Sequence, residues 1–153
     1  MHFPLPAGSR LAQFLAASCA LLAAVTAGAV DRKVEIKAPA QVKAHADFSA
    51  TISASTNAGG GEKVGFFQVD ASLDGGRTWS PVCYLDKLEA NFSRVVGLKS
   101  GRAGSAVKIR VRVAFRDGHA ADVDYTGTAI RWTESWDKWQ EPPAKSVTIS
   151  VVE

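Results

Sequence analysis

The chain has 153 residues, a formal net charge of +3 and an isoelectric point near 9.0. The charge is the balance of 18 basic against 15 acidic residues, and so small an excess is not the pattern of a nucleic-acid-binding protein. The length suits one domain with one hydrophobic core.

Residues 1–29 have the order of a secretory signal peptide. A start with Arg10 and no acid precedes an apolar run, Leu11 to Thr26, and Ala27-Gly28-Ala29 supplies the small residues that signal peptidase recognises. We predict cleavage after Ala29 and a periplasmic or secreted protein that is not stably inserted in a membrane. An uncleaved anchor is disfavoured because a spanning helix needs about 20 apolar residues. Lipidation at Cys19 is disfavoured because the residues before it include no large aliphatic side chain.

The remainder, residues 30–153, keeps 17 basic and 15 acidic residues, a net charge of +2. It alternates apolar and polar residues with the period of two that indicates half-buried strands. Strands with one wet face belong to antiparallel sheets that pack in pairs. The predicted strands are Val34–Ala38, Phe48–Ala54, Gly65–Leu73, Trp79–Leu85, Phe92–Leu98, Val107–Phe115, Ala121–Tyr125 and Val147–Val151.

Glycine-rich turns separate these strands. Asp74-Gly75-Gly76 and Asp117-Gly118 predict tight hairpins, and residues 57–61 and 99–104 predict longer loops. Strands and turns at such short spacing favour a β-sandwich over a βαβ fold. Cys83 is the one cysteine left after the leader, so no intrachain disulfide can form. We expect a buried, inert thiol, with an intermolecular disulfide as the alternative.

Two stretches carry a family resemblance. Phe67–Trp79 resembles the C strand and hairpin of fibronectin type III domains, and Arg94–Gly101 with Val107–Gly118 resembles their E and F strands. The hairpin, with its pattern S-x-D-G-G-x-T-W, is also similar to the immunoglobulin-like dimerisation domain of sulfite oxidase-type enzymes. The tyrosine of the F strand is missing at 105–107. The resemblance implies an all-β, antiparallel two-sheet immunoglobulin-like sandwich of about 7–9 strands.

The hairpin also resembles the Asp-box of sialidases and other β-proteins. In that motif an aspartate accepts backbone N–H bonds across the turn, glycine allows a left-handed step, and tryptophan packs under the hairpin. The resemblance implies a structural role and no activity. The matching residues are Ser72, Asp74, Gly76, Thr78 and Trp79.

Groups for catalysis are few after the leader. The histidines are His45 and His119, both in predicted turns, and the sequence contains no H-E-x-x-H, no G-x-S-x-G and no phosphate-binding loop. The acidic pairs Asp70/Asp74 and Asp122/Asp124 suit solvated β-strands, and a loosely held cation is the alternative. We predict no enzyme, no cofactor and no metal.

Two groups of residues are candidate binding surfaces. Lys108, Arg110 and Arg112 fall on one face of a strand, roughly 7 Å apart, which suits an anionic partner. The alternative is a solvated face paired with acids such as Asp70.

Trp132, Trp136 and Trp139 have the i, i+4, i+7 spacing of one side of a short helix near 133–140. Such a row favours stacking on sugars or a partner protein, and packing over the core is the alternative. We therefore predict an exported, non-enzymatic module that binds a protein or an extracellular glycan. The alternative function is an accessory or dimerisation-type subunit of a periplasmic redox enzyme.

Overall fold

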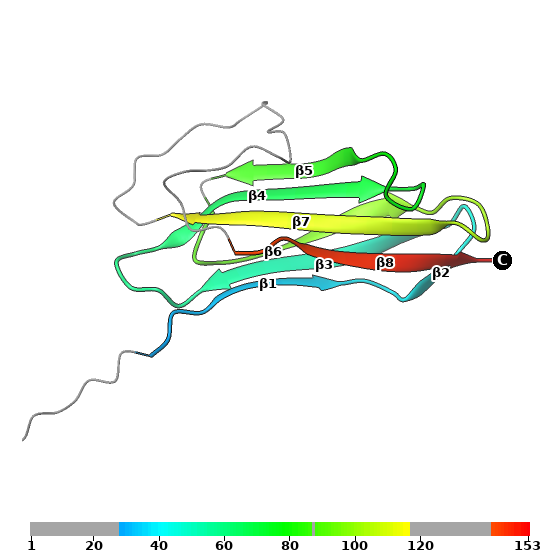
Figure 1. Ribbon diagram of the computed structural model, residues 1–153. Helices are drawn as coiled ribbons and strands as arrows, with labels where there is room; N and C mark the ends of the chain where they lie inside the picture. Colours follow the sequence, from blue (N-terminus) through cyan, green and yellow to red (C-terminus); the bar gives the residue numbers. More distant parts are fainter. Residues whose placement is uncertain (1–27, 87, 117–141) are drawn as a thin grey trace, which may run out of the picture.

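The computed structural model describes residues 28–86, 88–116 and 142–153, and these form an all-β sandwich of two sheets (Figure 1). The described residues contain no helix, so no candidate membrane-spanning helix is found among them. The eight strands are β1 (Arg32–Lys37), β2 (Gln41–Lys43), β3 (Asp47–Thr56), β4 (Lys63–Ser72), β5 (Ser80–Asp86), β6 (Asn91–Lys99), β7 (Ala106–Arg116) and β8 (Lys145–Val152).

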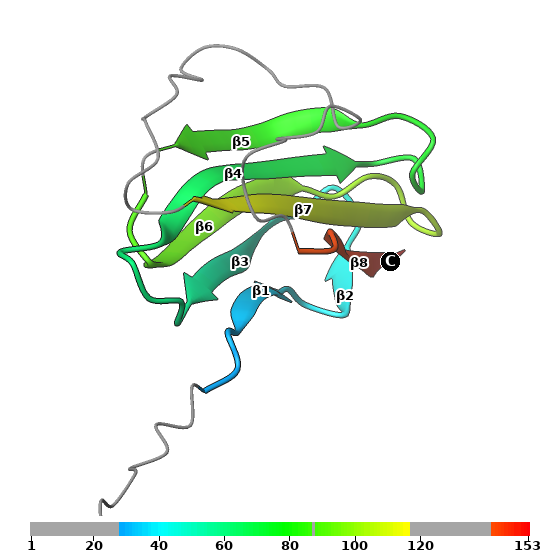
Figure 2. The ribbon, with the colours of Figure 1, turned by 60° about the vertical axis from the view of Figure 1, so that its left-hand side comes forward.

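The two sheets differ in size. Sheet A has three strands in the order β1-β3-β6, and sheet B has five in the order β2-β8-β7-β4-β5. Figure 2 shows the two layers facing each other. The predicted helix near 133–140, the predicted strand 121–125 and the leader residues 1–27 lie outside the described residues.

One pairing differs from the predicted antiparallel arrangement. β2 pairs with β8 in parallel, while every other pair among the described strands is antiparallel. Pro39 follows β1 and has no N–H for a ladder, so the chain leaves sheet A there and continues in the same direction into sheet B. Three residues are too few to give the alternation that identified the other strands, so the sequence did not predict β2.

The inner faces of the two sheets form the core, as the alternation predicted. Ile52 in sheet A and Val69, Val111 and Ile149 in sheet B have no exposed surface. The rings of Phe67 and Phe92 meet edge to face across the sheets, with centroids 5.2 Å apart.

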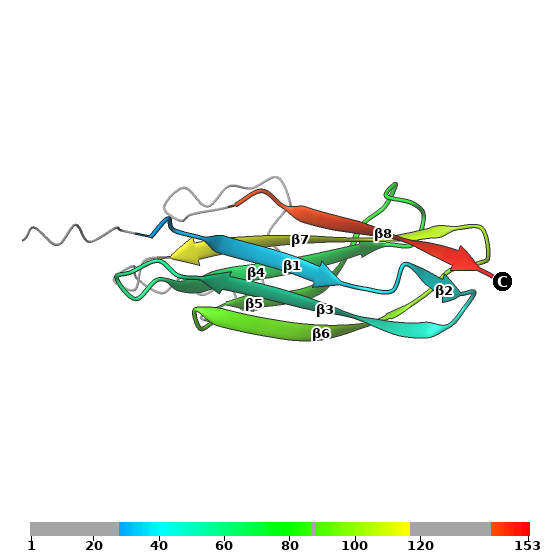
Figure 3. The same cartoon turned by 90° about the horizontal axis from the view of Figure 1, so that it is seen from below.

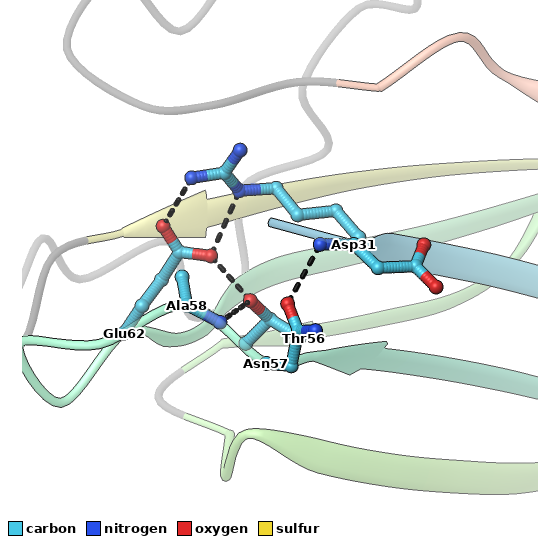
Figure 4. A network of polar contacts seen from close by, with 6 residues as sticks. Asp31, Thr56, Asn57, Ala58 and Glu62 are labelled. Carbon is cyan, nitrogen blue, oxygen red and sulfur yellow. Dashed lines mark hydrogen bonds and ion pairs between the residues drawn. The ribbon is translucent and has the colours of Figure 1, made fainter. Parts of the chain in front are cut away.

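A polar network joins the start of β1 to the loop between β3 and β4 (Figure 4). The carboxylate of Glu62, 8% exposed, accepts two hydrogen bonds from Arg32, at 2.8 and 2.7 Å, and a third from Thr56 Oγ1 at 2.6 Å. The bond to Glu62 raises the pKa of Arg32. Asn57 Oδ1 accepts from the backbone N–H of Asp31 at 2.6 Å. Buried charges need such partners, so the network holds the first strand in place.

Candidate functional site

The turn between β4 and β5 is organised by one carboxylate, that of Asp74. Its oxygens accept the backbone N–H of Arg77 at 2.9 Å, the backbone N–H of Thr78 at 2.9 and 3.1 Å, and the Thr78 hydroxyl at 2.6 Å. The hydroxyl of Ser72 also donates to Asp74 at 2.7 Å. These bonds, led by that from the Thr78 side chain, hold the pKa of Asp74 far below its ordinary value, so the carboxylate is charged at neutral pH.

Two glycines make this turn possible. Gly75 and Gly76 have φ of 76° and 101°, in the left-handed region that side chains with a Cβ disfavour. Gly76 donates its N–H to Ser72 Oγ at 2.8 Å, and its carbonyl accepts from Trp79 Nε1 at 3.1 Å. The five residues of the predicted Asp-box, Ser72 at the end of β4 and the other four in the turn, therefore all take part in these hydrogen bonds.

The loop between β6 and β7 lies beside the turn and is anchored from both ends. Ser100 Oγ accepts the N–H of Ala46 at 2.9 Å, and Gly104 N–H donates to the carbonyl of Val151 at 2.9 Å. The N–H of Gly75 donates to the carbonyl of Ala106 at 3.2 Å and links the turn to the end of the loop. Two segments about thirty residues apart in sequence are thus fixed side by side at one end of the sandwich.

A groove of about 650 Å³ lies between these two segments. The turn contributes Asp74, Gly75 and Arg77, and the loop contributes Arg102, Ala103 and Ser105. Arg77 and Arg102 are both exposed. Arg77 donates through Nε to the carbonyl of Asp74 at 3.2 Å, whereas Arg102 has no ion pair among the described residues. The groove therefore has a polar floor between two cationic side chains, and we name it the end groove.

The outer face of sheet B carries the predicted basic row. Arg110 donates from Nη2 and Nε to Asp70 Oδ2, at 2.8 and 3.1 Å, and its guanidinium lies over the ring of Trp79. Arg112 is 4% exposed, and Lys108 lies along Gly76 at the other end of the row. The three side chains therefore do not form one exposed stripe. β4 and β7 are inner strands of the sheet, and large side chains lie along this face.

Tyr84 is one of these large side chains. Its ring is tilted at 31° to that of Phe66, with centroids 6.3 Å apart. Burial raises the pKa of Tyr84, and the charge of Asp70 adds to the rise. The prediction of a solvent-exposed outer face is therefore wrong along the middle of β4 and β7, where Gln68 and Arg112 are buried.

Other sequence-based candidates lie elsewhere. Trp132, Trp136 and Trp139 lie outside the described residues, as do Asp122 and Asp124. Within residues 28–86, 88–116 and 142–153, no cluster of three or more His, Cys, Asp or Glu is found. Arg77 and Arg102 were not among the residues predicted from the sequence to form a site. In the sequence, each of these arginines follows a glycine in a connection between two strands. Only the fold brings the two connections together.

Of the comparisons with family models, curated proteins and solved structures, the last alone gives matches. No family model matches the chain, and no curated protein does. Among solved structures, the chain is similar to a superoxide reductase (neelaredoxin) from Ignicoccus hospitalis, with 12% identity, a TM-score of 0.47, and 80% of this chain and 82% of that chain covered. The prediction that the chain is not an enzyme is contradicted by this match, because the matched protein is named as an enzyme. We withdraw that prediction and assign no activity from the match.

Proposed function

We propose that the chain is an exported binding module that holds an acidic extracellular glycan in the end groove. Export rests on the predicted signal peptide. Recognition rests on one observation, the pair of exposed arginines, Arg77 and Arg102, on either side of a polar groove of about 650 Å³.

The chemistry of the two arginines supports an anionic ligand. A guanidinium presents planar N–H donors that match a carboxylate or a sulfate in two parallel hydrogen bonds. The bond from Arg77 Nε to the turn restricts that side chain and leaves its two terminal nitrogens for the ligand. Asp74 also lines the groove, but its oxygens are taken up by donors of the turn itself.

Charge, rather than aromatic stacking, would select the ligand in the described part of the molecule. Trp79 stands next to the turn, but Arg110 covers a face of its ring at 4.1 Å and its Nε1 is bonded to Gly76. Neutral sugars, which aromatic side chains bind by stacking, would find no free indole here. A uronic acid or a sulfated sugar would find two cations.

The test compares the processed chain with the variant Arg77→Ser/Arg102→Ser. Isothermal titration with oligogalacturonate and with a sulfated oligosaccharide should show binding by the wild type at low salt, at least tenfold weaker binding by the variant, and no binding of a neutral dextran oligomer. Lys33→Ser/Lys37→Ser removes the same charge from sheet A, and its binding should equal that of the wild type. Equal loss in the two variants, or no binding of either acid, would refute the proposal.

The second predicted function, an accessory or dimerisation-type subunit of a periplasmic redox enzyme, stays a prediction from the hairpin resemblance alone.

A further inference from the structure

Sheet A ends on β6, an edge strand with little protection against pairing. Edge strands of natural proteins are often short, or contain charged residues or proline, and these features discourage pairing with other chains. On β1, Lys33, Glu35 and Lys37 all point to the outer face, and β5 contains Pro81. β6 has nine residues, no proline, two charged residues (Arg94 and Lys99) and an exposed valine, Val95, at its centre. Figure 3 shows β6 along the margin of the sandwich.

The backbone of β6 offers a regular row of hydrogen-bonding groups at this margin. Ser100 donates its N–H to Ala46 and Ala90 accepts from Thr56, so even-numbered positions direct their backbone groups toward β3. In an antiparallel pair these directions alternate along the strand. The odd-numbered positions 91, 93, 95, 97 and 99 therefore direct N–H and C=O away from the sheet, where no other described strand pairs with them.

The sandwich is also incomplete beside β6. Sheet B has two more strands than sheet A, and β6 packs over β4, so β5 projects past the edge of sheet A. The inward side chains of β5 are consequently only half-buried, including Cys83 and Leu85. A cavity of about 290 Å³ lies here, lined by Leu73, Val82 and Leu98 among others, and Leu73 is 50% exposed. We name it the side slot.

We propose that an extended segment of a partner protein adds to β6 as a fourth strand of sheet A and fills the side slot with apolar side chains. Main-chain bonds to the odd-numbered positions would supply affinity, and alternate side chains of the added strand would face β5. This interaction surface shares Leu73 with the end groove but neither of the arginines that would bind the glycan.

The inward positions of β6 define the sequence that fits. Phe92, Val96 and Leu98 direct side chains toward sheet B, and so does Arg94, which is exposed. An added strand would therefore place apolar residues opposite the first three and an acidic residue opposite Arg94. Its outward residues would lie beside Ser93, Val95 and Gly97, where small polar side chains fit.

A single strand fits this edge better than a second copy of the chain. Pairing two β6 edges about a twofold axis would bring the two projecting β5 strands toward each other on the same side of the joined sheet. An isolated extended peptide has no second sheet and meets no such obstacle.

The test uses a fluorescent nonapeptide, Thr-Val-Thr-Val-Thr-Glu-Thr-Val-Thr, which, added antiparallel to β6, places its glutamate opposite Arg94 and its valines opposite Phe92, Val96 and Leu98. Binding to the processed chain is measured by anisotropy, and hydrogen exchange locates it. We expect slower exchange at the odd-numbered positions of β6. Val95→Pro removes one outward N–H without breaking a bond to β3, and should weaken binding at least tenfold. Val95→Thr keeps that N–H and should bind like the wild type.

Charge reversal provides the matched control. A peptide with lysine in place of glutamate should bind the wild type more weakly, and Arg94→Glu should restore its binding. Lack of peptide binding, protection of β1 or β5 in place of β6, or unchanged binding by Val95→Pro would overturn the proposal. So would a dimer, detected by light scattering, that Val95→Pro dissociates. Arg77→Ser/Arg102→Ser should bind the peptide normally, so the two proposals fail separately.

Discussion

The guanidinium carbon of Arg110 lies 4.1 Å from the centre of the Trp79 ring, while its nitrogens bind Asp70. Trp79 in turn bonds to Gly76 of the turn. The stacked pair thus joins β7 and β4 to the turn between β4 and β5, and so supports one wall of the end groove. A cation on an indole face and a largely buried ion pair act together here.

The first prediction concerns this pair. Arg110→Met leaves the carboxylate of Asp70, 7% exposed, without its cation, and should lower the free energy of unfolding by about 3 kcal/mol. Denaturant unfolding at pH 7 measures the loss. The double variant Asp70→Asn/Arg110→Met also removes the unpaired buried charge, and should regain more than half of the lost free energy of unfolding. A double variant less stable than Arg110→Met would contradict the ion-pair explanation.

The second prediction is an acid-labile contribution from Asp74. Because its folded pKa is lowered from an ordinary 3.8, the group stabilises the fold fully above that value and progressively less as the pH falls below it. At pH 7, Asp74→Asn should be less stable than the wild type, and the difference should shrink between pH 4 and pH 2. Thermal unfolding across this range provides the measurement. Asp47→Asn, which removes an exposed carboxylate of β3 outside the turn, is the control.

The third prediction tests the network that fixes β1. Glu62→Gln removes the charge that binds Arg32, and should cost about 2 kcal/mol because the carboxylate is nearly buried. Hydrogen exchange should become faster along β1, with little change in β7. Lys33→Met, which removes only an exposed pair with Asp31, should change stability by less than about 0.5 kcal/mol. Equal effects of the two variants would show that burial of Glu62 is unimportant.

The fourth prediction concerns Cys83, the free cysteine on β5. Burial raises the pKa of its thiol above the ordinary 9.0, and the charge of Arg94 opposes part of that rise. Alkylation by iodoacetamide at pH 8 should therefore be slower than for the unfolded chain, and Arg94→Ser should slow it further. Arg102→Ser, which removes a charge that has no influence on the pKa of the thiol, is the control. Reaction at the unfolded rate would contradict this account.

Local alternation was enough to predict seven of the strands. Residues such as Phe48, Ala50 and Ile52 alternate with small polar residues because successive side chains of a strand face opposite sides, and the register of β3 with β1 and β6 follows this pattern. The pattern was less informative in sheet B. Arg112 lies on the outer face and is nevertheless buried, which no local rule indicates.

The sequence by itself determined seven of the strands and the turn at Asp74, because these depend on residues a few positions apart, and the single apolar face of each strand indicated two packed layers. Tertiary structure alone decided that Arg77 and Arg102 flank one groove, that Arg110 stacks on Trp79, and that β6 is left as an open edge beside β5. The physical reason is that such contacts depend on which strands become neighbours. Strand order is set by the packing of the whole chain, and alternation along a single strand carries no information about it.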